Sequence, residues 1–126
     1  MSNNEAENYG GGMQLNTSLS NPTLTNSIIW NNSPESIYGS GPLITYSNIE
    51  GENTWTGEGN INSDPLFTDP DNGDYTLSWA NYPEDDETKS PCIDTGTIIE
   101  DMEYCGDAPD MGAYEYITED CEEDME

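Results

Sequence analysis

A tetrapeptide that returns three times constrains the fold of this chain more than any other feature of its sequence. The copies are Pro22-Thr23-Leu24-Thr25, Pro42-Leu43-Ile44-Thr45 and Pro65-Leu66-Phe67-Thr68, so the spacings are 20 and 23 residues. Between the first two copies the agreement continues, because Ser27 aligns with Ser47 and Ile29 with Ile49. A period of this length is typical of solenoids, in which each unit stacks on its neighbours to close its core.

The residue types of the repeat favour short strands over helices. β-Branched and aromatic residues alternate with turns rich in Gly, Pro, Asn and Ser. We expect strands at 24–30, 43–49, 66–68 and 75–79, and turns at 31–34, 39–42 and 71–73. An antiparallel sandwich or barrel would have hairpin turns about every 8 to 12 residues. The sequence therefore predicts an all-β fold, a right-handed parallel β-helix of about three to four coils.

Asparagine is frequent, with 14 copies in the chain. In a stacked coil, Asn side chains can occupy tight turns and bond to the adjacent coil. The alternative is that they are ordinary polar loop residues. Both interpretations stay open for any single Asn.

Composition makes folding difficult for this chain. Leu, Ile, Val and Phe together supply only 17 of 126 residues, and 27 acidic residues face one base, Lys89. A net charge of −26 opposes compaction through self-repulsion, and such a composition is typical of disordered chains. Three Trp, eight Tyr and the regular recurrence of apolar residues argue for a fold.

The same charge excludes several partners. Nucleic acids and anionic lipid surfaces are bound through Lys and Arg, which this chain almost entirely lacks. No stretch has the apolar length needed to cross a bilayer, so we expect neither nucleic-acid binding nor membrane insertion.

Five motifs occur in an order that resembles a known family. They are Asn26-Ser27-Ile28-Ile29-Trp30-Asn31-Asn32, Tyr46-Ser47-Asn48-Ile49, 59–67 (GNINSDPLF), 90–96 (SPCIDTG) and 110–116 (DMGAYEY). Together they look like the C-terminal part of bacterial secreted right-handed parallel β-helix proteins, the choice-of-anchor Q domain group. The resemblance spans roughly residues 10–116 and implies a secreted, extracellular or cell-surface protein whose last coils end in a C-terminal cap.

The resemblance divides the chain into β-helix coils (1–68), a last coil with the C-terminal cap (69–116) and an acidic tail (117–126). In the family an anchoring signal usually follows the last motif, whereas this tail is acidic and resembles no anchor. The Gly10-Gly11-Gly12-Met13 stretch looks like the middle of an earlier coil. We therefore expect either a fragment or a coil end that meets another copy.

The chain has few residue types that are suited to catalysis. The chain has no His and no Arg, so Ser-His-Asp and Cys-His arrangements are excluded within it. The resemblance brings polysaccharide lyases into consideration, because many of them are β-helix proteins. Those enzymes typically use a Lys or Arg as the base, and Lys89 alone is a poor candidate for it. Glycoside hydrolysis needs two carboxylates, and Asp85-Asp86 is one such pair, although a solvated loop is the preferred interpretation of it. We expect a non-catalytic protein.

Calcium suits the many oxygen donors of this chain, whereas zinc would favour His or clustered Cys. The strongest local cluster holds Asp69, Asp71 and Asp74. It is not an EF-hand loop, because Gly73 stands at its fifth position and Ala80 at its twelfth. A metal-free Pro-Asp-Asn-Gly turn is the alternative.

A second acidic cluster lies in the two most family-like C-terminal motifs and contains Asp94, Asp107, Asp110 and Glu115. These residues are candidate calcium ligands. The preferred interpretation is capping, in which Asp94 and Glu115 accept hydrogen bonds from backbone amides that the last coil leaves unpaired.

Three cysteines, Cys92, Cys105 and Cys121, allow at most one disulfide within the chain. A Cys92–Cys105 bridge closes the shorter loop, and the alternative is three free thiols. No partner for Cys121 can be assigned.

These observations predict an extracellular structural or adhesive β-solenoid that binds calcium and contacts a glycan or a cell surface. Two alternatives remain. Coils of separate subunits could stack end to end into a fibre, or the chain could be the C-terminal part of a carbohydrate-active β-helix enzyme whose site lies elsewhere.

Overall fold

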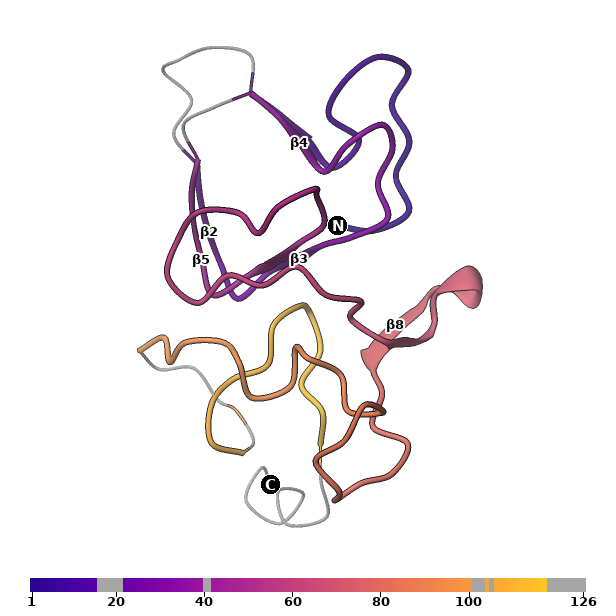
Figure 1. Ribbon diagram of the computed structural model, residues 1–126, viewed down its shortest axis with the longest axis vertical. Coiled ribbons are helices and arrows are strands. Elements are labelled where there is room, and N and C mark those ends of the chain that lie inside the picture. Colours follow the sequence, from indigo (N-terminus) through magenta and orange to yellow (C-terminus); the bar gives the residue numbers. More distant parts are fainter. Residues whose placement is uncertain (16–21, 40–41, 101–103, 105, 118–126) are drawn as a thin grey trace.

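The structure is a computed structural model that describes residues 1–15, 22–39, 42–100, 104 and 106–117. The fold is all-β: within the described residues, the regular elements are short strands and a single 3-10 turn. They are β1 (Met13–Gln14), β2 (Thr23–Thr25), β3 (Ile28–Ile29), β4 (Ile37–Tyr38), β5 (Leu43–Thr45), β6 (Asn48–Ile49), β7 (Phe67–Asp69), η1 (Pro70–Asn72) and β8 (Asp74–Leu77). Strands β2 to β5 lie in the upper half of Figure 1. The described residues of 90–117, called the C-terminal segment below, lie in the lower half.

Three strand pairs are parallel. β1 pairs with β4, β2 with β5, and β3 with β6. In the second and third pairs, Thr23 faces Leu43 and Ile29 faces Ile49, so the offset is 20 residues in both. The 20-residue spacing and the alignment of Ile29 with Ile49 are therefore confirmed as structural register.

The predicted strands at 24–30 and 43–49 are each divided in two. Asn26 (φ 53°) separates β2 from β3, and Tyr46 (φ 50°) separates β5 from β6. Both residues lie in the left-handed region, which interrupts an extended strand and turns the chain. Two corners at equivalent positions let β5 and β6 follow β2 and β3 in parallel.

Buried side chains tie the two stacked segments together. The Ser47 hydroxyl, fully buried, accepts the Ser27 N–H at 3.1 Å and donates to the Thr45 carbonyl at 2.9 Å. Asn60 accepts the Ser47 N–H at 3.1 Å and donates to the Ile44 carbonyl at 2.9 Å. The interpretation of Asn side chains as links between chain segments is confirmed for Asn60.

The core is divided into two apolar clusters. One contains Ile29, Ile44 and Ile49, with Leu24, Ile37 and Trp55 packed against it. The other contains Ile28, Leu77, Cys92, Ile93 and Met111, with Trp30, Ile61, Phe67, Trp79 and Tyr116 around it. Because successive side chains of a strand point to opposite faces, Ile28 and Ile29 reach different clusters, and β3 forms the wall between them.

The third copy of the tetrapeptide does not continue the parallel pairing. β7 pairs with β8 in antiparallel orientation, with Phe67 facing Leu77. The interpretation of 66–68 and 75–79 as coil strands is therefore wrong. The reason is the predicted turn at 71–73: η1 and Gly73 (φ 81°) reverse the chain within a few residues, and so short a connection joins only antiparallel strands. This hairpin crosses the predicted boundary at residue 68.

A different segment lies against the second pair of strands. The Tyr46 N–H donates to the Glu58 carbonyl at 2.8 Å, and the Ile49 N–H donates to the Ile61 carbonyl at 3.1 Å. Asn48 and Ile61 form a parallel bridge. Parallel contact thus extends beyond β6 as far as Ile61, but the strands of the described residues form two-stranded sheets and no solenoid.

The C-terminal segment contacts the corner between β2 and β3 at Asn26. The Gly112 N–H donates to the Asn26 carbonyl at 2.7 Å, and the Asn26 side chain exchanges hydrogen bonds of 2.8 and 2.7 Å with the backbone of Thr97. Gly112 has a φ of 96°, a backbone conformation that favours glycine, and it lies against the Ile28 side chain. The predicted acidic tail, apart from Ile117, lies outside the described residues.

Candidate functional site

Asp110 is the buried centre of the C-terminal acidic cluster, with 2 % of its surface exposed. One carboxylate oxygen accepts the Asp94 N–H at 2.7 Å, and the other accepts the Tyr116 N–H at 2.5 Å. The Asp110 N–H in turn donates to Glu115 Oε2 at 3.1 Å. One side chain therefore holds together two backbone segments that are separated by more than twenty residues.

Burial raises the pKa of Asp110 from its ordinary value of 3.8 to about 7. The charges of Glu115 and Asp94 raise this pKa further, while the two amide donors lower it. Burial also raises the pKa of Asp94, with smaller contributions from Asp107 and Glu115. The structure thus brings all four predicted carboxyl groups close enough to influence one another.

The capping interpretation, in which Asp94 and Glu115 accept backbone amides that the last coil leaves unpaired, stays a prediction. Glu115 accepts the N–H of Asp110, five residues before it, and the backbone N–H of Asp94 donates to Asp110. Asp94 has a φ of 59°, in the left-handed region where Asp is enriched among non-Gly residues. The sequence signal that could have identified Asp110 is its place at the start of the 110–116 motif. It stands two residues before Gly112, which donates to the carbonyl of Asn26.

The second predicted cluster lies at the β7–β8 hairpin, where its carboxylates have local partners. Asp69 accepts the Asn72 side-chain amide at 2.8 Å. Asp74 accepts the Thr76 hydroxyl at 2.6 Å and the Thr76 N–H at 3.1 Å, and these bonds lower the pKa of Asp74. Asp71 lies exposed in η1. These contacts agree with the metal-free turn that was the alternative interpretation.

No group of three or more His, Cys, Asp and Glu side chains is arranged to hold a metal ion within the described ranges. Calcium binding by either cluster therefore stays a prediction. The pair Asp85-Asp86 lies in an exposed turn, where Asp86 accepts the Thr88 hydroxyl at 2.6 Å and the Asn81 amide at 2.9 Å.

Cys92 is a free, fully buried cysteine in the structure. Burial raises the pKa of its thiol to about 11, and the Asn48 side chain donates to its sulfur at 3.3 Å. Cys105 and Cys121 lie outside the described residues, so the Cys92–Cys105 bridge stays a prediction.

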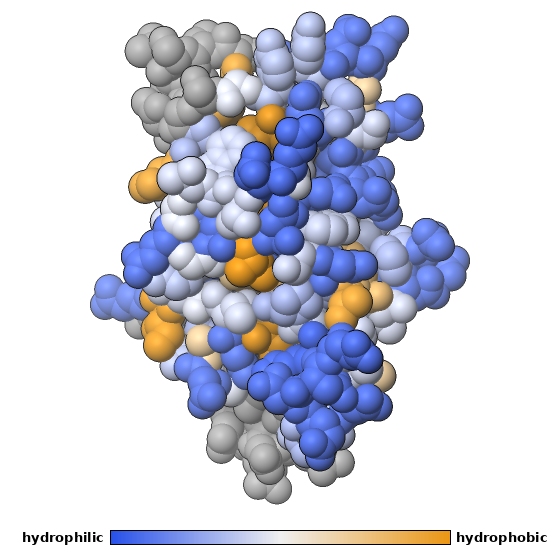
Figure 2. All heavy atoms as spheres, viewed as in Figure 1, coloured by the Kyte–Doolittle hydropathy of each residue, from blue (hydrophilic) through white to orange (hydrophobic). Residues whose placement is uncertain are grey.

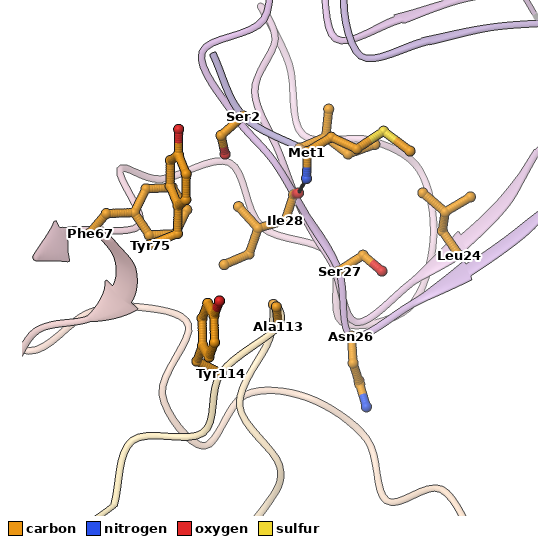
Figure 3. A pocket seen from close by; sticks show the side chains of 12 residues that line it. Met1, Ser2, Leu24, Asn26, Ser27, Ile28, Phe67, Tyr75, Ala113 and Tyr114 are labelled. Atoms are coloured by element: carbon orange, nitrogen blue, oxygen red, sulfur yellow. Dashed lines mark hydrogen bonds between the residues drawn. The ribbon is translucent and has the colours of Figure 1, made fainter. Parts of the chain in front are cut away.

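A cavity of about 550 Å³ was not predicted from the sequence. It lies where β2 and β3, the β7–β8 hairpin and residues 112–114 meet, and Figure 3 shows the residues around it. Its walls come from residues far apart along the chain, among them Leu24, Phe67 and Tyr114, so no local motif indicates it.

Comparison with known proteins identifies no relative: no family model matches the chain, and neither do the curated proteins or the solved structures searched. Among the described residues, no helix has the length and apolar character needed to span a membrane.

Proposed function

We propose that this chain is a non-catalytic extracellular module with a structural or adhesive role, built as a right-handed parallel β-helix with a C-terminal cap. The observation that carries the proposal is the 20-residue register between β2–β3 and β5–β6. Two side-chain hydrogen bonds support it. The Ser47 hydroxyl accepts the N–H of Ser27 and the Asn60 side chain accepts the N–H of Ser47, so each links one chain segment to the next.

The C-terminal segment supports the capping part of the proposal. Asp110 and Glu115 accept backbone N–H groups, and Gly112 donates to the carbonyl of Asn26 at the corner of the first coil. A cap of this kind covers a coil end that would otherwise recruit another chain. The resemblance to choice-of-anchor Q proteins adds the expectation of secretion or display at a cell surface, with a glycan or surface partner.

Calcium is proposed as a stabilising ion of the acidic surface. Figure 2 shows hydrophilic side chains over most of the visible face, and the chain carries 27 acidic residues against one base. Extracellular modules bind calcium at about 0.1 to 1 mM, an affinity that does not demand a rigid, preformed cage.

Electron microscopy of the purified chain at about 1 mM calcium tests the architectural proposal. We expect discrete particles, because the C-terminal segment covers one end of the coil. Filaments would favour the end-to-end fibre instead. Cleavage of a polysaccharide by the same preparation, lost in an Asp85→Asn and Asp86→Asn double variant, would contradict the non-catalytic assignment.

Calcium should raise the melting temperature of the chain, because a cation held by several carboxylates relieves the repulsion of 26 uncompensated charges. At about 1 mM calcium, a native-state site with a dissociation constant of about 0.1 mM adds roughly 1.4 kcal/mol to the unfolding free energy. Calorimetry with calcium and with chelator, at matched ionic strength, measures the effect.

Two variants locate the calcium effect. Replacing Asp69, Asp71 and Asp74 by Asn removes part of the rise if the hairpin binds the ion, and Asp107→Asn removes it if the C-terminal cluster does. Asp85→Asn is the matched control for a lost surface charge. A melting temperature that chelator leaves unchanged would show that the carboxylates do not bind calcium.

A further inference from the structure

The cavity between β2–β3 and the C-terminal segment is lined mostly by apolar and aromatic residues. They include Leu24, Ile28, Phe67, Tyr75, Ala113 and Tyr114, and the uncharged polar residues Ser2, Asn26 and Ser27 also line it. Figure 3 shows Tyr114 and Ala113 on one side of the hollow, Phe67 and Tyr75 on a second side, and Ile28 between them. Concave, mostly apolar hollows of about 300 to 1,000 Å³ are the usual binding sites for small molecules.

The rings at this cavity are held in place by the protein. Phe67 and Tyr75 meet edge to face, with centroids 5.2 Å apart and planes at 85°. The Tyr75 hydroxyl accepts a hydrogen bond of 3.0 Å from the Asn3 side chain. Tyr114 stands at the rim with 53 % of its surface exposed. A ligand ring would therefore meet two fixed aromatic groups and one accessible ring.

The charges of the cavity walls and of the whole protein limit which ligands the cavity can bind. No lining residue carries a charged side chain, although the chain has 28 acidic and basic residues in all. The Met1 amino group at the wall donates to the Ile28 carbonyl at 2.7 Å, and burial lowers its pKa. Walls that disfavour a charge and a net protein charge of −26 both act against an anionic ligand.

We propose that this cavity binds a small uncharged aromatic molecule, which would pack its ring against Phe67, Tyr75 and Tyr114. Aromatic rings pair favourably in offset or edge-to-face geometry, beyond the effect of burying their area. The binding is independent of the proposed structural role, since it uses the junction of coil and C-terminal segment and not the stacking surfaces of the coils.

Titration with N-phenyl-1-naphthylamine, an uncharged aromatic dye whose emission rises in apolar surroundings, tests the proposal on the full chain. We expect saturable binding of one dye per chain. Tyr114→Ala should weaken it by about tenfold, the loss of one aromatic contact. Ala113→Trp should weaken it at least as much by filling the hollow. Both changed residues are exposed, so the fold should tolerate the substitutions.

Tyr9→Ala is the matched control, because Tyr9 is 52 % exposed and stacks on Tyr38 instead of lining the cavity. Its affinity for the dye should equal that of the parent chain. Binding that does not saturate, or that is equally strong in the parent, Tyr114→Ala and Ala113→Trp chains, would overturn the proposal. Weakening in Tyr9→Ala instead would place the dye on the Tyr9–Tyr38 pair and overturn it as well.

Discussion

Replacing Asp110 by Asn should remove a large part of the pH dependence of folding. The pKa of Asp110 is about 7 in the folded chain and about 3.9 when unfolded, so between these values the folded state holds a proton that the unfolded state has released. The unfolding free energy of the parent chain should therefore fall as pH rises from 4 to 7, by up to about 1.4 kcal/mol per pH unit, and then level off.

The Asp110→Asn chain should also be less stable in acid. Its amide keeps one oxygen acceptor but places an NH₂ group where the second carboxylate oxygen accepts a backbone N–H. One unsatisfied buried donor costs about 1 to 3 kcal/mol. The expected result is a lower but flatter profile of unfolding free energy against pH, measured by urea denaturation at several pH values.

Asp85→Asn is the control for the loss of one carboxylate, because Asp85 is exposed. The unfolding free energy of Asp85→Asn should depend on pH with the same slope as that of the parent chain. The pKa of Asp94 is raised by burial and acts in the same direction as that of Asp110. The pKa values of Asp74 and Asp86 are lowered by hydrogen bonds and act in the opposite direction. Equal slopes in the Asp110→Asn and parent chains would refute the assignment of the pH dependence to Asp110.

Asn48→Ala should destabilise the chain by about 2 to 4 kcal/mol. The Asn48 side chain is fully buried, donates to the Ser63 carbonyl at 2.6 Å and accepts the Ser63 N–H at 3.1 Å. Its loss removes both hydrogen bonds to the Ser63 backbone, at about 0.5 to 1.5 kcal/mol for each bond, and opens a cavity at a fully buried position, which costs further stability. Equilibrium urea unfolding measures the change.

A second readout follows from the bond between Asn48 and the sulfur of Cys92. The cavity left by the substitution lies beside the thiol, so alkylation of Cys92, followed by peptide mass analysis, should become faster. Asn62→Ala is the matched control: its side chain donates to the Gly51 carbonyl in an exposed position, and its loss should cost less than about 0.5 kcal/mol. Equal stability of the two variants would refute the structural role of Asn48.

The repeat at 22–25 and 42–45 was enough to predict all-β structure and the 20-residue register, because stacked strands must present matching side chains to one core. The Asp71-Asn72-Gly73 turn was also predictable, since Gly73 supplies the left-handed conformation that ends η1. The third tetrapeptide led to a wrong prediction of parallel pairing. Its residues match the repeat, but the turn that follows within a few residues imposes antiparallel pairing with β8.

Composition identified the acidic residues of the C-terminal segment but not what each one does. Asp94 and Asp110 are both aspartates in family-like motifs, and only the tertiary structure shows that Asp110 is the buried acceptor of two backbone N–H groups. The aromatic cavity likewise depends on residues from three distant segments. Sequence by itself determined the all-β class, the 20-residue register and the Asp71-Asn72-Gly73 turn, because these follow from local conformational preference and periodicity. The environment of a carboxylate and the walls of a cavity depend on long-range contacts, so only the tertiary structure decided them.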